Sequence, residues 1–263
     1  MENSTLQFYN QLAGDYHLIF PDWKKAVLKH GEFLDNLIRS HMDASPLSVL
    51  DCTCGIGTQA IGLALRGYEV HATDLSPEAV EHAAKNAGAF GVSIAFGTAD
   101  LRTLDTQVDG LFDIVISCDN ALPHLLNDEE LLLAARNIRS KLRQDGLFMA
   151  SIRNYDQILE EKPRSTMPSV FDDPEGRRVV FQIWDWSDDG RTYTTQLFIV
   201  KKVKDDWRVA QYQTEYRALL RDELNAILQK SGFSEIRWHM PDGSWNTLTP
   251  TGYYQPIVTA HKR

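Results

Sequence analysis

The sequence predicts an α/β protein: a doubly wound sheet of seven mostly parallel strands, with an inserted antiparallel β-meander and an N-terminal helical lid. Three observations support this prediction. Residues 47–152 alternate short apolar runs with longer amphipathic runs, which is typical of βαβ units and a parallel sheet. Residues 153–217 change to long β-type runs joined by turn residues. The segment before residue 45 has helical spacing and is unusually rich in aromatic residues.

The central segment is expected to supply five strands and three helices. The strands are expected at residues 47–50, 68–73, 92–96, 112–117 and 147–152. The helices are expected at residues 59–65, 77–90 and 128–142. Ser76 before Pro77 is a typical N-cap followed by a proline in the first helical turn, so the second of these helices has a clear start.

The flanking segments are expected to add two more strands, the lid and the meander. The further elements are helices within 5–41, interrupted at Phe20-Pro21-Asp22, meander strands at 177–186, 192–203 and 207–216, a helix at 221–230, and strands at 235–240 and 255–261. We therefore expect a lid at 1–45, a Rossmann-like domain formed by 46–152 and 218–263, and an antiparallel insertion at 153–217.

Composition narrows the class of partner. The chain has 263 residues, of which 43% are hydrophobic and 24% charged, so disorder, collagen and coiled coil are excluded. The formal net charge of −9 would repel nucleic acids and anionic membranes, which favours a small-molecule partner. We see neither a signal peptide nor an apolar run long enough for a membrane helix, so a cytoplasmic protein is expected.

Three cysteines, Cys52, Cys54 and Cys118, are too few for a disulfide framework. Cys52 and Cys54 lie close together, but zinc needs three or four ligands and no His or Cys cluster lies nearby in sequence. We therefore expect no metal site.

A tight glycine turn follows the first strand. The run Asp51-Cys52-Thr53-Cys54-Gly55-Ile56-Gly57 places an acid at the end of the strand and two glycines before a helix. Because glycine has no Cβ, a ligand can approach the backbone there. The same turn could instead be a compact strand-to-helix connection, since glycine pairs are common in such joins.

Two further acids follow the next two strands. Asp74 comes 23 residues after Asp51, where an acid of a Rossmann-like unit can accept hydrogen bonds from ribose hydroxyls; alternatively, it only caps the next helix. Asp100 could accept from a purine amine, with Leu75 and Leu101 on either side of the ring. Three acids converging on one crevice would repel pyrophosphate. They suit a ligand with adenine, ribose and a cationic centre, which describes S-adenosylmethionine.

With these residues, the chain resembles the class I S-adenosylmethionine-dependent methyltransferases, and more closely the glycine N-methyltransferase and glycine/sarcosine methyltransferase group. Residues 51–57 match the family's acid-x-(Gly/Ala)-x-Gly-x-Gly motif, except that Thr53 replaces the first small residue. Residues 117–125 (SCDNALPHL) resemble the group's segment after strand four, and residues 152–159 (IRNYDQIL) resemble its R-N-Y-D run after strand five. Ordered motifs cover about residues 5–160.

The resemblance implies a role for individual residues. The cofactor-binding residues would be Tyr9, Tyr16, Trp23, Asp51, Thr53, Gly55, Gly57, Asp74, Leu75, Asp100, Leu101 and Cys118. Arg153 would hold a substrate carboxylate, which suits a guanidinium; alternatively, it forms a structural salt bridge. Asn120, His124 and Tyr16 would form hydrogen bonds around the acceptor amine, although His124 could equally be a buried structural histidine.

The resemblance also implies that the insertion covers the substrate. Tyr216 and Arg217 resemble the group's aromatic site near the late helix. An aromatic roof is suggested by Trp184, Trp186, Trp207, Trp245, Tyr253 and Tyr254, most of which are expected to be ordinary core packing.

The resulting hypothesis is methyl transfer to the nitrogen of a small molecule, such as the amino acids glycine or sarcosine or another amine, with S-adenosylhomocysteine as product. Such an in-line displacement needs alignment and exclusion of water. One alternative is an N- or O-methyltransferase of a heterocyclic specialised metabolite. Others are a nicotinamide-dependent oxidoreductase and a non-catalytic adenosyl-ligand-binding protein. Nucleobase methylation is disfavoured because the N-P-P-Y type motif is absent after strand four. A homo-oligomer is left open.

Overall fold

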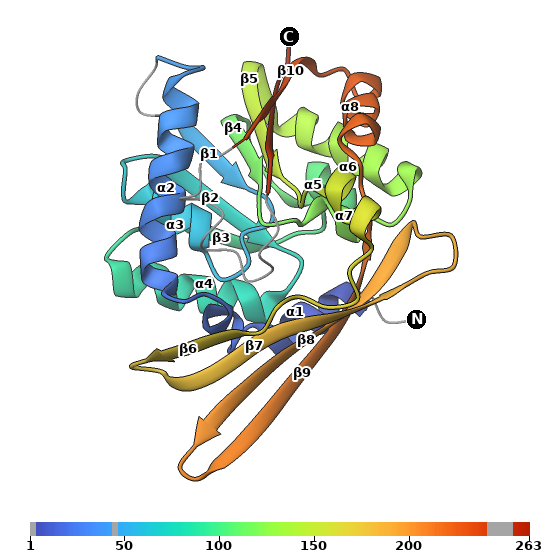
Figure 1. Ribbon diagram of the computed structural model, residues 1–263. Coiled ribbons are helices and arrows are strands. Elements are labelled where there is room, and N and C mark those ends of the chain that lie inside the picture. Colours follow the sequence, from blue (N-terminus) through green and yellow to red (C-terminus); the bar gives the residue numbers. More distant parts are fainter. Residues whose placement is uncertain (1–3, 44–46, 241–254) are drawn as a thin grey trace.

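The computed structural model describes residues 4–43, 47–240 and 255–263, and these form two separate sheets (Figure 1). The larger sheet consists of β1 (Ser48–Asp51), β2 (Glu69–Asp74), β3 (Ala95–Thr98), β4 (Phe112–Ser117), β5 (Leu142–Ser151), β10 (Ser234–His239) and β11 (Ile257–His261). Its order is β10-β11-β5-β4-β1-β2-β3. Strands β1 to β5 pair in parallel, and β11 is antiparallel to both of its neighbours. The predicted fold class is confirmed.

Helices cover both faces of this sheet (Figure 1). On one face lie α2 (Trp23–Arg39), α3 (Thr58–Ala64) and α4 (Pro77–Phe90). On the other lie α5 (Leu104–Gln107), α6 (Asp128–Lys141) and α8 (Arg221–Lys230). Neighbouring residues of one strand, such as Val49 and Leu50 of β1, belong to the two different cores, because successive strand side chains point to opposite faces. This alternation places a hydrophobic core on each side.

Helices α2 and α3 cross at glycine contacts. A Cβ on Gly62 would lie 2.5 Å from the carbonyl oxygen of Val27, and a Cβ on Gly31 would lie 2.5 Å from that of Gly62. Only hydrogen fits at either position. The close crossing holds the helix that follows the glycine turn firmly in place.

The smaller sheet is antiparallel and has the order β6-β7-β8-β9. Its strands are β6 (Ser169–Asp173), β7 (Gly176–Trp186), β8 (Thr192–Val203) and β9 (Asp206–Arg217). The lid elements α1 (Ser4–Leu12) and η1 (Tyr16–Ile19) pack on its inner face, and α1 lies between the two sheets (Figure 1). The lid therefore contributes to any space enclosed there.

The structure corrects several expected elements. The insertion has four strands rather than three, because the short segment of β6 was not recognised, and helix α7 (Tyr155–Glu161) was also missed. Of the predicted aromatic roof, Trp184 is buried core and Trp207 is 48% exposed. Trp245, Tyr253 and Tyr254 lie outside the described residues.

Candidate active site

A cavity of about 840 Å³, open to solvent, lies at the carboxyl ends of the parallel strands. Ligands of open α/β sheets bind at this edge. The predicted site residues that line it are Tyr9, Tyr16, Thr53, Gly55, Asp74, Leu75, Asp100, Leu101, Cys118 and His124. Those that do not are Trp23, Asp51, Gly57, Asn120 and Arg153. We call this space the first cavity.

The glycine turn forms one wall of the first cavity. Gly55 has a φ of +52°, and a Cβ there would meet nothing within 4 Å, so its backbone faces open space. Gly57, the N-cap of α3, has a φ of +95° and instead packs against Ile61. The turn thus brings bare backbone to the cavity at one position and supports the helix at the next.

Asp74 ties this turn to the start of α4. Its Oδ2 accepts from the backbone N–H of Gly55 at 2.8 Å, and its Oδ1 accepts from that of Ser76 at 2.9 Å. The N-cap of α4 is Ser76, whose hydroxyl accepts from the Ala79 N–H. Asp74 is therefore not the N-cap, but it binds the backbone of the residue that is. Burial raises the pKa of Asp74, and these backbone bonds oppose the rise. Each carboxylate oxygen keeps a further acceptor site for a ligand hydroxyl.

The three predicted acids do not all line the cavity, because Asp51 is buried behind it. Asp51 is 1% exposed and does not line the first cavity. Its Oδ1 accepts only a 3.3 Å bond from the Thr53 N–H, and burial raises its pKa to about 8. The strand β1 is central in the sheet, so this side chain is enclosed by neighbouring elements and is mostly protonated at neutral pH.

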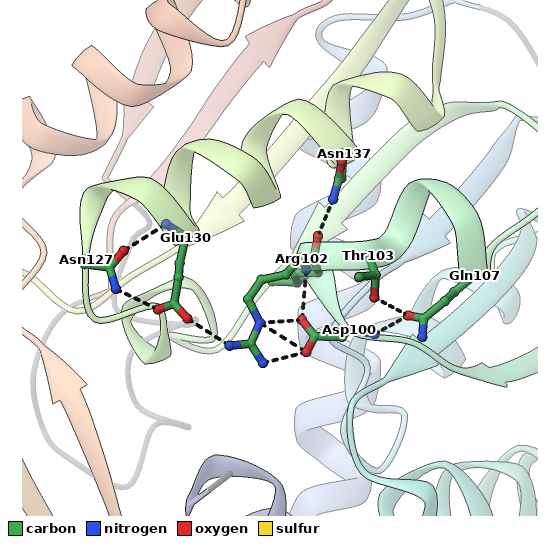
Figure 2. Close-up of polar contacts among 8 residues, drawn as sticks. Asp100, Arg102, Thr103, Gln107, Asn127, Glu130 and Asn137 are labelled. Carbon is green, nitrogen blue, oxygen red and sulfur yellow. Dashed lines mark hydrogen bonds and ion pairs between the residues drawn. The ribbon is translucent and has the colours of Figure 1, made fainter. Parts of the chain in front are cut away.

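Asp100 is neutralised by a neighbour that the sequence interpretation missed. It caps η2 (Leu101–Thr103), and its carboxylate binds the Arg102 guanidinium, with Nη2 2.6 Å from Oδ2 (Figure 2). Arg102 Nη1 also binds Glu130 of α6 at 2.8 Å, as Figure 2 shows. Burial acts to raise the pKa of Asp100, but the bonds from Arg102 outweigh it and lower the pKa. This end of the cavity is therefore less acidic than predicted.

His124 joins the lid to the second sheet. Its Nδ1 lies 3.2 Å from the Glu215 carbonyl oxygen of β9, and its Nε2 lies 2.9 Å from the Tyr9 hydroxyl of α1. A carbonyl only accepts, so Nδ1 carries the proton and Nε2 accepts from Tyr9. Burial lowers the pKa of His124 to about 3. His124 is therefore neutral, and its contacts position Tyr9.

A second cavity of about 500 Å³ adjoins the first, and Tyr9, Tyr16 and Asp119 line both. Arg153 lines the second cavity and is 6% exposed. Its Nη1 donates to the Tyr193 hydroxyl at 2.6 Å, and its Cζ lies over the rings of Trp184 and Tyr216, 5.2 and 4.9 Å from their centres.

Arg153 forms no ion pair within the described part of the chain, and its Nε is buried without a hydrogen-bond partner. The alternative of a structural salt bridge is therefore wrong. A buried cation without an anionic partner is costly, so this position favours an anionic ligand.

The turn after β4 brings Asp119 to the junction of the two cavities. Asp119 and Asn120 have φ angles of 57° and 67°, which Asp and Asn tolerate better than most residues. Both of their backbone N–H groups donate to Ser151. Asn120 lines neither cavity; its Oδ1 accepts from the Arg153 N–H at 3.0 Å, so it supports the backbone of Arg153 instead of facing a substrate.

Trp23 also differs from expectation. Its Nε1 donates to the Thr58 hydroxyl at 2.9 Å and its ring packs against Phe90, and Trp23 does not line the first cavity although Thr58 does. Among residues 4–43, 47–240 and 255–263, no three His, Cys, Asp or Glu side chains are grouped in a way that could hold a metal ion. Within the same ranges, no helix has the length and apolar character needed to cross a bilayer.

Comparison with known proteins agrees with this geometry. Residues 49–146 match the family model described as "Methyltransferase domain". The chain is 31% identical over 139 residues to a glycine/sarcosine N-methyltransferase of Parasynechococcus marenigrum, covering 53% of this chain and 48% of the relative. It is 30% identical over 203 residues to human glycine N-methyltransferase, covering 72% of this chain and 63% of the relative. The chain thus spans about half to two-thirds of the length of these relatives.

The solved structure of the CcbJ methyltransferase from Streptomyces caelestis has a similar fold. It matches with a TM-score of 0.72 at 18% identity and covers 98% of both chains. The matched domain begins in β1 and includes the glycine turn, Asp74 and Asp100. Residues 49–146 therefore form a methyltransferase domain, and the chain resembles the class I S-adenosylmethionine-dependent methyltransferases, among them the glycine N-methyltransferase group.

Proposed function

We propose that the protein transfers a methyl group from S-adenosylmethionine to the nitrogen of a small molecule that carries a carboxylate, such as an amino acid of the glycine or sarcosine type. The observation that carries this proposal is Arg153, a buried cation without an acidic partner, in a cavity that adjoins the glycine-turn cavity. A guanidinium binds a carboxylate through paired hydrogen bonds, and such a contact would fix the acceptor next to the donor.

The first cavity fits the adenosyl donor. Gly55 leaves the space of a missing Cβ open, and Asp74 keeps acceptor capacity beside it. Leu75 and Leu101 provide apolar walls near Asp100. When bound, S-adenosylmethionine supplies a methyl group attached to a cationic sulfur.

This chain's own residues would align the partners and exclude water. The Tyr9 hydroxyl uses its one O–H to donate a hydrogen bond to His124. Its oxygen can therefore still accept a hydrogen bond at the junction of the two cavities. Tyr16 lines both cavities and, within the described residues, forms no hydrogen bond through its hydroxyl. Burial raises the pKa of both tyrosines well above the ordinary value, so both remain protonated at neutral pH. We infer that they orient the acceptor without taking its proton.

The proposed roles follow from this arrangement. Donor contacts are assigned to Tyr9, Thr53, Gly55, Asp74, Leu75, Asp100, Leu101 and Cys118, and Arg153 is assigned to the acceptor carboxylate. The division into a lid at 1–45, a methyltransferase domain at 46–152 and 218–263, and a substrate-covering insertion at 153–217 is part of the same proposal.

Two experiments test the proposal against its alternatives. Calorimetric titration should detect binding of S-adenosylhomocysteine and none of NADH; the reverse result would favour an oxidoreductase. Labelled S-adenosylmethionine should then transfer label to amino acids in preference to planar heterocycles. Binding without transfer to any acceptor would indicate a non-catalytic adenosyl-ligand-binding protein.

A further inference from the structure

The second cavity has an apolar wall in addition to the charge of Arg153. This apolar wall is formed by Phe8 and Leu12 of α1, Ile19 at the end of η1, the following Phe20, and Leu197 of β8. This wall lies where the lid packs on the inner face of the smaller sheet. Glycine has no side chain that could contact this wall. The space therefore suits an acceptor with an apolar group.

Asp119 adds an opposite charge to the same cavity. Its Oδ2 accepts from Gln59 Nε2 at 2.8 Å, and the same nitrogen lies 3.1 Å from Nδ1 of the buried His30. Gln59 lies in α3 and is buried, so its hydrogen bond restricts the position of the Asp119 carboxylate. Its Oδ1 has no hydrogen bond within the described part of the chain. One carboxylate oxygen thus remains available for a cationic ligand group.

Three chemical requirements therefore meet in one space: a buried cation at Arg153, a fixed anion at Asp119 and an apolar wall. Tyr16 lies within the influence of both charges, because Asp119 raises its pKa and Arg153 lowers it. A carboxylate alone, an amine alone or an alkane alone would leave one of these features unmatched. A zwitterion with an apolar side chain matches all three.

We infer that the methyl acceptor is an α-amino acid with an aliphatic or aromatic side chain, whose carboxylate binds Arg153, whose amine binds Asp119 and whose side chain contacts Leu12, Phe20 and Leu197. This inference rests on the proposed methyl transfer and narrows its substrate class. The amine loses one proton to water, and its lone pair forms the new N–C bond. The S–C bond breaks with its electron pair left on sulfur, so the products are the N-methyl amino acid, the thioether and one released proton.

The test is a panel of acceptors with labelled S-adenosylmethionine: leucine, phenylalanine, glycine, leucinamide and 4-methylpentanoate. Leucine or phenylalanine should exceed glycine in kcat/KM by about tenfold or more, since burial of each added methylene contributes appreciably. Leucinamide, which lacks the carboxylate, should be poor, and 4-methylpentanoate, which lacks the amine, should not react. A preference for glycine, or equal use of leucinamide and leucine, would overturn the inference.

Variants locate the preference in the second cavity. Leu197→Trp fills the apolar wall and should lower kcat/KM for leucine about tenfold more than for glycine. Phe198→Trp, next to it on β8 but on the opposite face of the sheet, is the matched control and should change neither. Asp119→Asn should raise KM for leucine by a larger factor than it changes the Kd for S-adenosylhomocysteine. Equal losses for leucine and glycine in Leu197→Trp, together with no effect of Asp119→Asn, would contradict the assignment.

Failure of this inference can be told apart from failure of the proposed function. Transfer to glycine or to another amine, with no preference for apolar side chains, would leave the proposed function standing and overturn the substrate class. S-adenosylhomocysteine binding without transfer to any member of the panel would overturn both.

Discussion

The Tyr9 hydroxyl donates a hydrogen bond to Nε2 of His124 across 2.9 Å, and this contact connects the lid to the turn after β4. The other ring nitrogen of His124 contacts the Glu215 carbonyl of β9. One neutral imidazole thus joins three segments that are distant in sequence. Both of its contacts require a single tautomer, so protonation of the ring would remove the acceptor that Tyr9 uses.

We predict that the contribution of His124 to the free energy of unfolding decreases as the pH falls below about 6.5, the unfolded pKa of histidine. Burial lowers the folded pKa of His124 to about 3, so in this range the unfolded state binds the proton and the folded state does not. The expected slope from His124 is about 1.4 kcal/mol per pH unit. In urea unfolding at pH 7, 6 and 5, His124→Gln should gain stability relative to the parent protein as the pH falls, and a difference that stays constant over this range would argue against the prediction.

Asp51 is expected to change the free energy of unfolding with pH in the opposite direction to His124. Burial raises its folded pKa to about 8, so the folded state keeps a proton that the unfolded state loses above about pH 4. Stability from this group is present at low pH and is lost as the pH rises toward 8, by about 1.4 kcal/mol per pH unit. Asp51→Asn resembles the protonated side chain and should therefore gain stability relative to the parent as the pH rises. Parallel stability curves for the two proteins between pH 5 and 8 would contradict this.

A pair of identical substitutions tests the α2–α3 crossing. Gly62→Ala places a Cβ 2.5 Å from the Val27 carbonyl oxygen, so backbone must move, and we expect a loss of roughly 1–3 kcal/mol or more in unfolding free energy. Gly88→Ala, in α4, meets nothing within 4 Å and should instead stabilise by about 0.5–1 kcal/mol, since alanine favours helix. Thermal and urea unfolding of the two variants should show changes in unfolding free energy of opposite sign.

The donor and acceptor residues should separate in a kinetic experiment. Asp74→Ala removes the acceptors proposed for the ribose hydroxyls and should raise the Kd for S-adenosylhomocysteine about 10- to 100-fold, because hydrogen bonds to charged groups contribute roughly 1.5–3 kcal/mol. Arg153→Ala should raise KM for a carboxylate substrate more than it changes that Kd. Calorimetry and initial rates give the two quantities. Equal effects of both variants on donor affinity would remove the assigned roles.

Local patterns were sufficient for most elements of the fold. The predicted helix 77–90 and the predicted strand 192–203 have the observed bounds, because a capping Ser-Pro pair marks the start of the helix and turn residues at 187–190 and 204–206 border the strand. The glycine turn and Asp74 also lie at the cavity as expected. Where a residue's position depends on its own strand or turn, the sequence was informative.

Charge at the site could not be predicted in the same way. The neutralisation of Asp100 depends on the rotamer of Arg102 and on Glu130 from α6, and the burial of Asp51 depends on packing around the central strand. Asp119 belongs to the segment 117–125 that resembles the methyltransferase group, but its position at both cavities depends on the fold of the turn. An Asp-Asn pair directly after a buried strand was the one available signal, since such pairs favour left-handed turns.

Strand β11 lies between β5 and β10 and pairs with Ser151 through residue 257, after the entire insertion has intervened. During synthesis on the ribosome, β5 must therefore remain an open edge while the smaller sheet and α8 emerge. Contacts between such distant segments form slowly. A nascent chain of this protein would expose the unpaired backbone groups of β5 to chaperones or to other chains until β11 is synthesised and pairs with them.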